Sequence, residues 1–218
     1  MKINKNRSTV FIFIGAVGYL ICLIADIILS VLPNGLLLGE ALSEYEKAVY
    51  VMSGTASSRF VLSAGAGTLS MVLIALGMYG IYLFLSGSNP KASYLVLISG
   101  IGAAVMGAVY HIICTTAAWI FIEGKMTREA FDLYQKYISD HTLLMSLNAV
   151  FYTVMALTLF ILTVTGKTKM PRWFCVFNVV LIYFILSALG VPGSTSIGGL
   201  VMCIALAVYS LKHDREAE

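Results

Sequence analysis

The hydrophobic pattern of the chain consists of long apolar runs, which end where charged residues gather. A charged side chain at the centre of a bilayer is costly, so the charges mark the borders of membrane-spanning segments. A helix needs about 20 apolar residues to cross a bilayer. On this basis we predict six spans, at residues 9–32, 60–85, 92–122, 141–164, 173–190 and 195–211.

Continuous apolar runs of this length also predict the fold class. Backbone groups in lipid must pair within the protein, and only helices and closed barrels achieve this. The strands of a membrane barrel alternate between apolar and polar residues over about 10 positions, and these runs do not alternate. The expected fold is all-α: a polytopic bundle of six transmembrane helices, forming a single domain over residues 1–218.

Two loops, residues 33–59 and 123–140, are long and show the residue spacing of amphipathic helices. We expect short helices over Glu40–Met52 and Thr127–Ile138. Helices of this kind lie in the plane of the membrane interface. There they would either cap the bundle against the headgroups or form a lid over an outward-facing cavity. The two apolar stripes contain Ala41, Leu42, Tyr45, Ala48, Val49 and Met52, and Ala130, Phe131, Tyr134, Tyr137 and Ile138.

The composition agrees with a membrane protein and excludes several other classes. Charged residues make up 11% of the chain, against about 25% in soluble domains, and the mean hydropathy is +0.90. These values exclude a soluble globular enzyme, a disordered chain and a disulfide scaffold. The net charge of +3 is too small to indicate nucleic-acid binding, so the expected surroundings are a lipid bilayer.

The distribution of Lys and Arg predicts the orientation, because cytoplasmic loops carry an excess of these residues. Nine of the 14 lie at the two ends of the chain and in the short loops at residues 86–91 and 165–172. The other five lie among acidic residues in the two long loops. We therefore expect a multi-pass protein of the cell membrane, with both termini in the cytoplasm and the long loops outside.

Residues that could carry redox or metal chemistry form no known motif. The cysteines all lie within predicted spans without a C-x-x-C pair, so we interpret them as small buried hydrophobes. They are Cys22, Cys114, Cys175 and Cys203. A catalytic zinc site normally has three protein ligands, and Asp26 with His111 and His141 is one conceivable set. Because no motif supports that set, we expect no metal and no cofactor.

Glycines are frequent within the predicted spans. Small residues let the backbones of membrane helices approach closely, so we predict that these glycines serve helix packing rather than phosphate binding. They include Gly15, Gly18, Gly65, Gly67, Gly77, Gly80, Gly100, Gly102 and Gly107.

Polar side chains from four predicted spans fall at a similar depth, toward the outer side. Asp26 is the charged residue within the spans, and an ionisable residue inside a membrane is a functional candidate that needs a partner. We expect Arg59, His111 or His141 to lie within direct or one-water reach of its carboxylate. The candidate ligand-binding residues are Asp26, Arg59, His111, Thr115, Trp119, His141 and Asn148, and none is assigned a catalytic role.

Three functional hypotheses follow from this polar layer. The first is a bundle without enzymatic activity that binds, and could also transport, a small or lipid-like molecule through an outward-facing pocket. The second is a membrane-embedded enzyme acting on a lipid or isoprenoid, with Asp26 and His111 as an acid/base pair. The third is an accessory subunit of a larger membrane complex. The sequence leaves the ligand and the oligomeric state open.

Overall fold

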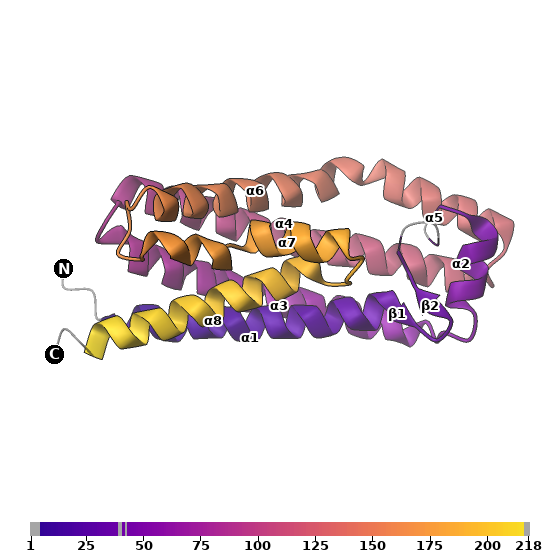
Figure 1. Ribbon diagram of the computed structural model, residues 1–218. Helices are drawn as coiled ribbons and strands as arrows, with labels where there is room; N and C mark the ends of the chain where they lie inside the picture. Colours follow the sequence, from indigo (N-terminus) through magenta and orange to yellow (C-terminus); the bar gives the residue numbers. More distant parts are fainter. Residues whose placement is uncertain (1–4, 39–40, 42, 216–218) are drawn as a thin grey trace.

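The computed structural model describes residues 5–38, 41 and 43–215, and the side chains of residues 7–38, 41 and 43–212. The described chain is helical apart from one short hairpin. Five of its helices are long and apolar enough to cross a membrane: α1 (Lys5–Ser30), α3 (Ser58–Ser86), α4 (Pro90–Glu123), α6 (Thr142–Val164) and α8 (Ser194–Arg215). They run along the long axis of the molecule (Figure 1).

The two ends of the bundle differ in their connections. Helix α1 begins and α8 ends at the same end, which we call the terminal end (Figure 1). The opposite end carries a β-hairpin of β1 (Val31–Leu32) and β2 (Gly35–Leu36), and we call it the hairpin end. The hairpin is a departure from a purely helical chain, and its two strands pair antiparallel across a two-residue turn.

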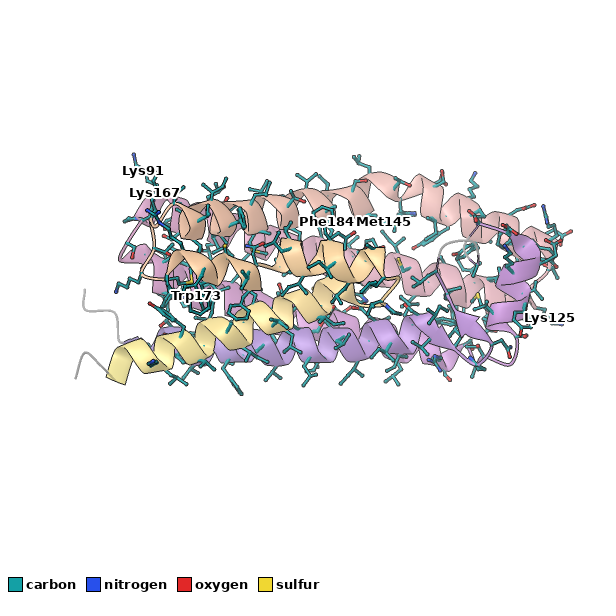
Figure 2. All side chains as sticks on the ribbon, in the orientation of Figure 1. Lys91, Lys125, Met145, Lys167, Trp173 and Phe184 are labelled. Atoms are coloured by element: carbon teal, nitrogen blue, oxygen red, sulfur yellow. The ribbon has the colours of Figure 1, made fainter. Side chains whose placement is uncertain are left out.

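The outside of the bundle is apolar between these two ends, as in a protein surrounded by lipid. Figure 2 shows Lys91 and Lys167 at the terminal end and Lys125 at the hairpin end, with Phe184 between them along the axis. Phe184 is 65% exposed, and many other large apolar side chains also face outward. Such a surface would be an aggregation liability in water but is the expected one in a bilayer.

Helices α1 and α3 pack with their backbones in close contact. A Cβ atom placed on Gly15 would lie 2.7 Å from the Cα atom of Gly77, and one placed on Gly80 would lie 2.6 Å from the backbone nitrogen of Ile12. Neither position has room for a side chain. The prediction that glycines serve packing is confirmed at these positions, whereas Gly65 has no atom within 4 Å of such a Cβ and lies in open space.

The span predicted at residues 173–190 is wrong as a single helix. The structure divides it into a 3-10 helix, η2 (Arg172–Phe177), and a short α-helix, α7 (Val179–Ala188). Asn178 separates them with an extended backbone, and its side-chain oxygen accepts a hydrogen bond from the Val180 amide at 3.0 Å. Asn favours this capping role over a place inside a helix, and the apolar pattern around it hides the break.

A tight turn between α7 and α8 brings the start of α8 beside α1. Gly190 and Gly193 have φ angles of +68° and +69°, a conformation that glycine adopts without steric cost. A Cβ on Gly193 would lie 3.2 Å from an oxygen of the Asp26 carboxylate. The turn therefore places the first residues of α8 against the polar part of α1.

An apolar cap covers the hairpin end. Helix α2 (Tyr45–Met52) and helix α5 (Arg128–Asp140) bury Met52, Phe131 and Tyr134 against Phe121 of α4. Burial raises the pKa of the Tyr134 phenol above its ordinary value, and the nearby Cys114 thiol adds to the effect. The phenol is thus neutral at physiological pH and acts as part of an apolar contact.

The helices of the cap differ in direction. Helix α5 continues the line of α6 beyond a single residue, His141, whereas α2 crosses the end of the bundle (Figure 1). Of the helix expected over Glu40–Met52, residues 40 and 42 lie outside the described residues. The apolar stripe of α5 packs on α4, so this face of the helix is buried within the protein.

The contact between α1 and α3 leads to a first prediction. Replacing Gly77→Ala should lower the stability of the protein by about 1–3 kcal/mol, because the added methyl group overpacks the helix contact. Gly65→Ala, in the same helix but in open space, should be neutral or stabilising, since Ala favours helix by up to about 1 kcal/mol. The midpoint of thermal unfolding in detergent measures both, and equal midpoints for the two variants would contradict the close contact.

Candidate functional site

Asp26 lies on α1, one turn before its end, and side chains from two other helices meet its carboxylate. The Ser196 hydroxyl of α8 donates a hydrogen bond to Oδ2 at 2.6 Å. The Nε2 atom of His111, on α4, lies 3.7 Å from Oδ1. The Asp26 side chain remains 20% exposed, whereas that of His111 is 6% exposed. The carboxylate therefore connects a buried imidazole with a partly open position.

Cys22 completes the cluster one helical turn before Asp26. Its Sγ atom lies 3.4 Å from Nε2 of His111. Residues four apart share one face of a helix, so Cys22 and Asp26 both face α4. One atom each from Cys22, Asp26 and His111 lies within 4.8 Å of the other two. We call Cys22, Asp26, His111 and Ser196 the polar cluster.

The imidazole of His111 is seated directly on the backbone of α3. A Cβ atom on Gly67 would lie 2.7 Å from both Cγ and Nδ1 of the ring, so only glycine permits this seat. The Nδ1 atom is buried and has no hydrogen-bond partner among the described residues. Gly67 thus fixes the position of the ring, while Nε2 is directed at Asp26 and Cys22.

Two features of its surroundings stabilise negative charge on the Asp26 carboxylate, against the cost of its burial. The carboxylate accepts a hydrogen bond from Ser196, in the first turn of α8. The N-terminus of a helix carries a partial positive charge, which stabilises a nearby anion. Among the described residues no lysine or arginine nitrogen is paired with this carboxylate. The cluster therefore combines an anionic oxygen, an imidazole nitrogen and a thiol, which are donor atoms for a cation.

On the side facing the terminal end, the interior below the polar cluster is filled by buried side chains. Tyr19 lies about one turn before Cys22 on α1 and packs against Gly199 of α8. The Tyr152 hydroxyl of α6 donates to the Thr195 carbonyl at 3.3 Å, and Met155 and Cys203 are fully buried. A ligand would therefore not reach the exposed part of Asp26 through this packed core.

Arg59 does not pair with Asp26, contrary to one expectation from the sequence. Its guanidinium donates to the carbonyls of Ile28 at 2.5 Å and Ile27 at 3.5 Å, and also to that of Val31. The last carbonyls of a helix lack donors within the helix, and a cation there also interacts favourably with the helix dipole. Arg59 therefore caps α1.

Three other candidates lie outside the polar cluster. The Asn148 side-chain amide donates to the Ala103 carbonyl of α4 at 2.8 Å. His141 contacts the Tyr137 carbonyl through Nδ1 at 2.8 Å, at the joint between α5 and α6. Trp119 is 41% exposed. The expected stripe of His111, Thr115 and Trp119 turns away from the cluster at Trp119, because eight residues of an α-helix exceed two full turns.

Thr115 lies on the same helix one turn beyond His111 and is buried. Its hydroxyl donates to the His111 carbonyl at 2.6 Å. This bond satisfies the hydroxyl within α4, so Thr115 supports the helix that carries the imidazole without contributing a donor atom to the cluster.

Sequence reasoning missed Cys22 and Ser196. The signal for Cys22 was present, since it precedes Asp26 by four residues. Ser196 could not be found in this way, because its position depends on the turn between α7 and α8.

A cleft of about 590 Å³ lies at the hairpin end, separate from the polar cluster. Pro33, Thr55, Ser58 and Arg59 are among its lining residues, and neither Asp26 nor His111 contributes to it. Arg59 already caps α1 from this position. The cleft therefore does not provide the pocket around Asp26 that the sequence predicted.

A family of unknown function, DUF6796, matches residues 1–213. No curated protein and no solved structure matches the chain.

The capping role of Arg59 leads to a second prediction. Arg59→Met should reduce the stability by about 1.5–3 kcal/mol, the usual contribution of hydrogen bonds to a charged group, because the carbonyls at the end of α1 lose their donors. Lys136→Met, at an exposed position of α5, is the control and should have little effect. Thermal unfolding in detergent is the measurement, and an unchanged midpoint for Arg59→Met would exclude the cap.

Proposed function

The chain belongs to DUF6796, a family of unknown function, and from the geometry within its bundle we propose that it is a membrane protein that binds a small cation. The observation that supports this proposal is the meeting of Cys22, Asp26 and His111 within 4.8 Å of one another. Intramembrane ionisable residues that converge from different helices commonly mark ion sites or ion pathways.

The size of the cluster favours an ion over a larger ligand. The Cys22 sulfur and the Asp26 oxygen lie 3.4 and 3.7 Å from Nε2 of His111, which is close enough for the three donor atoms to bind one central ion. The carboxylate supplies negative charge, and Arg59, the nearest basic candidate, is bound to carbonyls of α1. A cation is therefore the ligand whose charge and size suit the site.

This proposal narrows the hypotheses drawn from the sequence. A lipid-like ligand or an enzyme substrate would need a larger space beside Asp26 and His111, and the cleft of about 590 Å³ lies at other residues. Movement of the ion toward the terminal end would require the packed side chains around Met155 and Cys203 to separate. We therefore propose binding at the polar cluster and leave transport out of the proposal.

We also propose six membrane crossings with both termini in the cytoplasm. The sixth crossing consists of η2 and α7, which run from the terminal end toward the middle of the bundle (Figure 1). At 2.0 Å per 3-10 residue and 1.5 Å per α-helical residue, these elements and Asn178 extend roughly 30 Å. That length approaches the hydrocarbon thickness of a bilayer, about 30 Å. The excess of Lys and Arg at the terminal end supports a cell-membrane protein whose terminal end faces the cytoplasm.

The cation proposal leads to a third prediction. Thermal unfolding of the purified protein in detergent is measured with Na⁺, K⁺, Mg²⁺, Ca²⁺, Mn²⁺ and Zn²⁺ in turn. A bound ion stabilises the folded state in proportion to the logarithm of its concentration, so at least one ion should raise the midpoint. Asp26→Asn should abolish this rise, because it removes the anionic ligand while preserving the shape of the side chain.

Two controls separate binding from general effects of salt. Asp132→Asn makes the same chemical change at an exposed position of α5 and should retain the response. Gly67→Ala preserves every donor atom but displaces the His111 ring, and should weaken the response. The absence of any ion effect that depends on Asp26 would exclude the proposed function.

The topology leads to a fourth prediction. A reporter enzyme that is active only in the cytoplasm should be active when it is fused after Glu218. A cysteine-directed reagent that does not cross membranes should label Lys125→Cys from outside intact cells. An external C-terminus would contradict the proposed orientation, and a C-terminus on the same side as residue 125 would contradict the three crossings proposed between them.

A further inference from the structure

Building on the proposed cation site, we infer that Cys22, Asp26 and His111 form a tetrahedral site for a divalent transition metal of the zinc class. The first reason is the chemical nature of the donors. Zinc is bound by cysteine sulfur, histidine nitrogen and carboxylate oxygen, whereas magnesium and calcium take oxygen ligands. A thiolate and an imidazole in the same site select against the alkali and alkaline-earth ions.

The second reason is the separation between the donor atoms. Ligand bonds of the usual zinc lengths at tetrahedral angles place neighbouring donors about 3.3–3.6 Å apart. The observed separations are 3.4 Å between Cys22 Sγ and His111 Nε2, and 3.7 Å between His111 Nε2 and Asp26 Oδ1. The remaining separation, between Cys22 and Asp26, is within 4.8 Å. Small side-chain rotations would bring all three donors onto one ion.

The third reason is the way in which the ligands are held. Ligating carboxylates are themselves hydrogen-bonded in metal sites, and Ser196 donates to Oδ2 of Asp26, whereas the oxygen nearer His111 is Oδ1. The His111 ring is 5% exposed, yet Nδ1 has no partner in the described structure. The nitrogen directed at Cys22 and Asp26 is Nε2, so a metal ion there would be bound by the buried ring without any movement of α4.

The number of ligands indicates what kind of site this is. Three protein ligands leave the fourth tetrahedral position for water or another small ligand, as in zinc sites that remain open. Of the three ligand side chains, that of Asp26 is the most exposed, at 20%, whereas Cys22 and His111 are buried. We therefore place the open position beside its carboxylate, away from the packed core around Met155.

The experiment uses the full-length protein, purified in detergent and stripped of metal with a chelator. Co²⁺ is titrated in and followed by absorbance, because a cobalt–thiolate bond gives a charge-transfer band, and Zn²⁺ is then added to displace it. The wild type should bind one equivalent with this band and lose it to Zn²⁺. Cys22→Ser should lose the band and bind Zn²⁺ at least about tenfold more weakly, and Ser196→Ala should weaken Zn²⁺ binding about 10-fold or more.

Cys175→Ser is the matched control, because it removes a thiol in η2 that lies outside the cluster, and should bind like the wild type. Unfolding midpoints measured without metal identify any variant that fails to fold. If Cys22→Ser is unstable, Ser196→Ala still tests the site, because it retains all three ligands. Failure of the wild type to bind Co²⁺ and Zn²⁺, or binding that Cys22→Ser leaves unchanged, would overturn the inference. If another cation still stabilises the protein through Asp26, the proposed cation function stands and only the metal assignment fails.

Discussion

A polar group surrounded by lipid must find its partner within the protein, and this constraint governs most of the side-chain contacts described above. Asn148 is bonded to a carbonyl of α4, Asn178 to the Ala156 carbonyl of α6 at 3.0 Å, and Arg59 to the end of α1. Each contact joins two separate elements of the chain. The polar residues therefore fix which helices are neighbours, and the apolar residues fill the space that this arrangement leaves.

The polar cluster differs from those contacts in one respect. Asn148 and Arg59 satisfy backbone carbonyls, which have fixed positions and neutral charge. Asp26, His111 and Cys22 face one another with side-chain donor atoms, and Nδ1 of His111 has no partner among the described residues. Helix packing alone does not require three titratable groups at one point. Their convergence is therefore the feature that points to a ligand.

The sequence predicted much of the helical arrangement but only part of the site. Apolar runs located the five long helices, and the need for a partner led from Asp26 to His111, because both depend on composition and depth. Rotation about the helix axis was harder to predict, so Trp119 was placed with His111 although it faces outward. Arg59 was assigned to the nearest acid, since capping of carbonyls depends on how a helix ends. The break at Asn178 and the hairpin were hidden by apolar neighbours.

The length of α4 has a consequence for the part of the protein that lies outside lipid. Its 34 residues correspond to about 51 Å at 1.5 Å per residue, and even a tilt of about 40° leaves about 39 Å along the bilayer normal. The hydrocarbon layer is only about 30 Å thick. Helix α4 therefore cannot be contained in the hydrocarbon, and at one end of the bundle or at both its turns must lie among the lipid headgroups or beyond them.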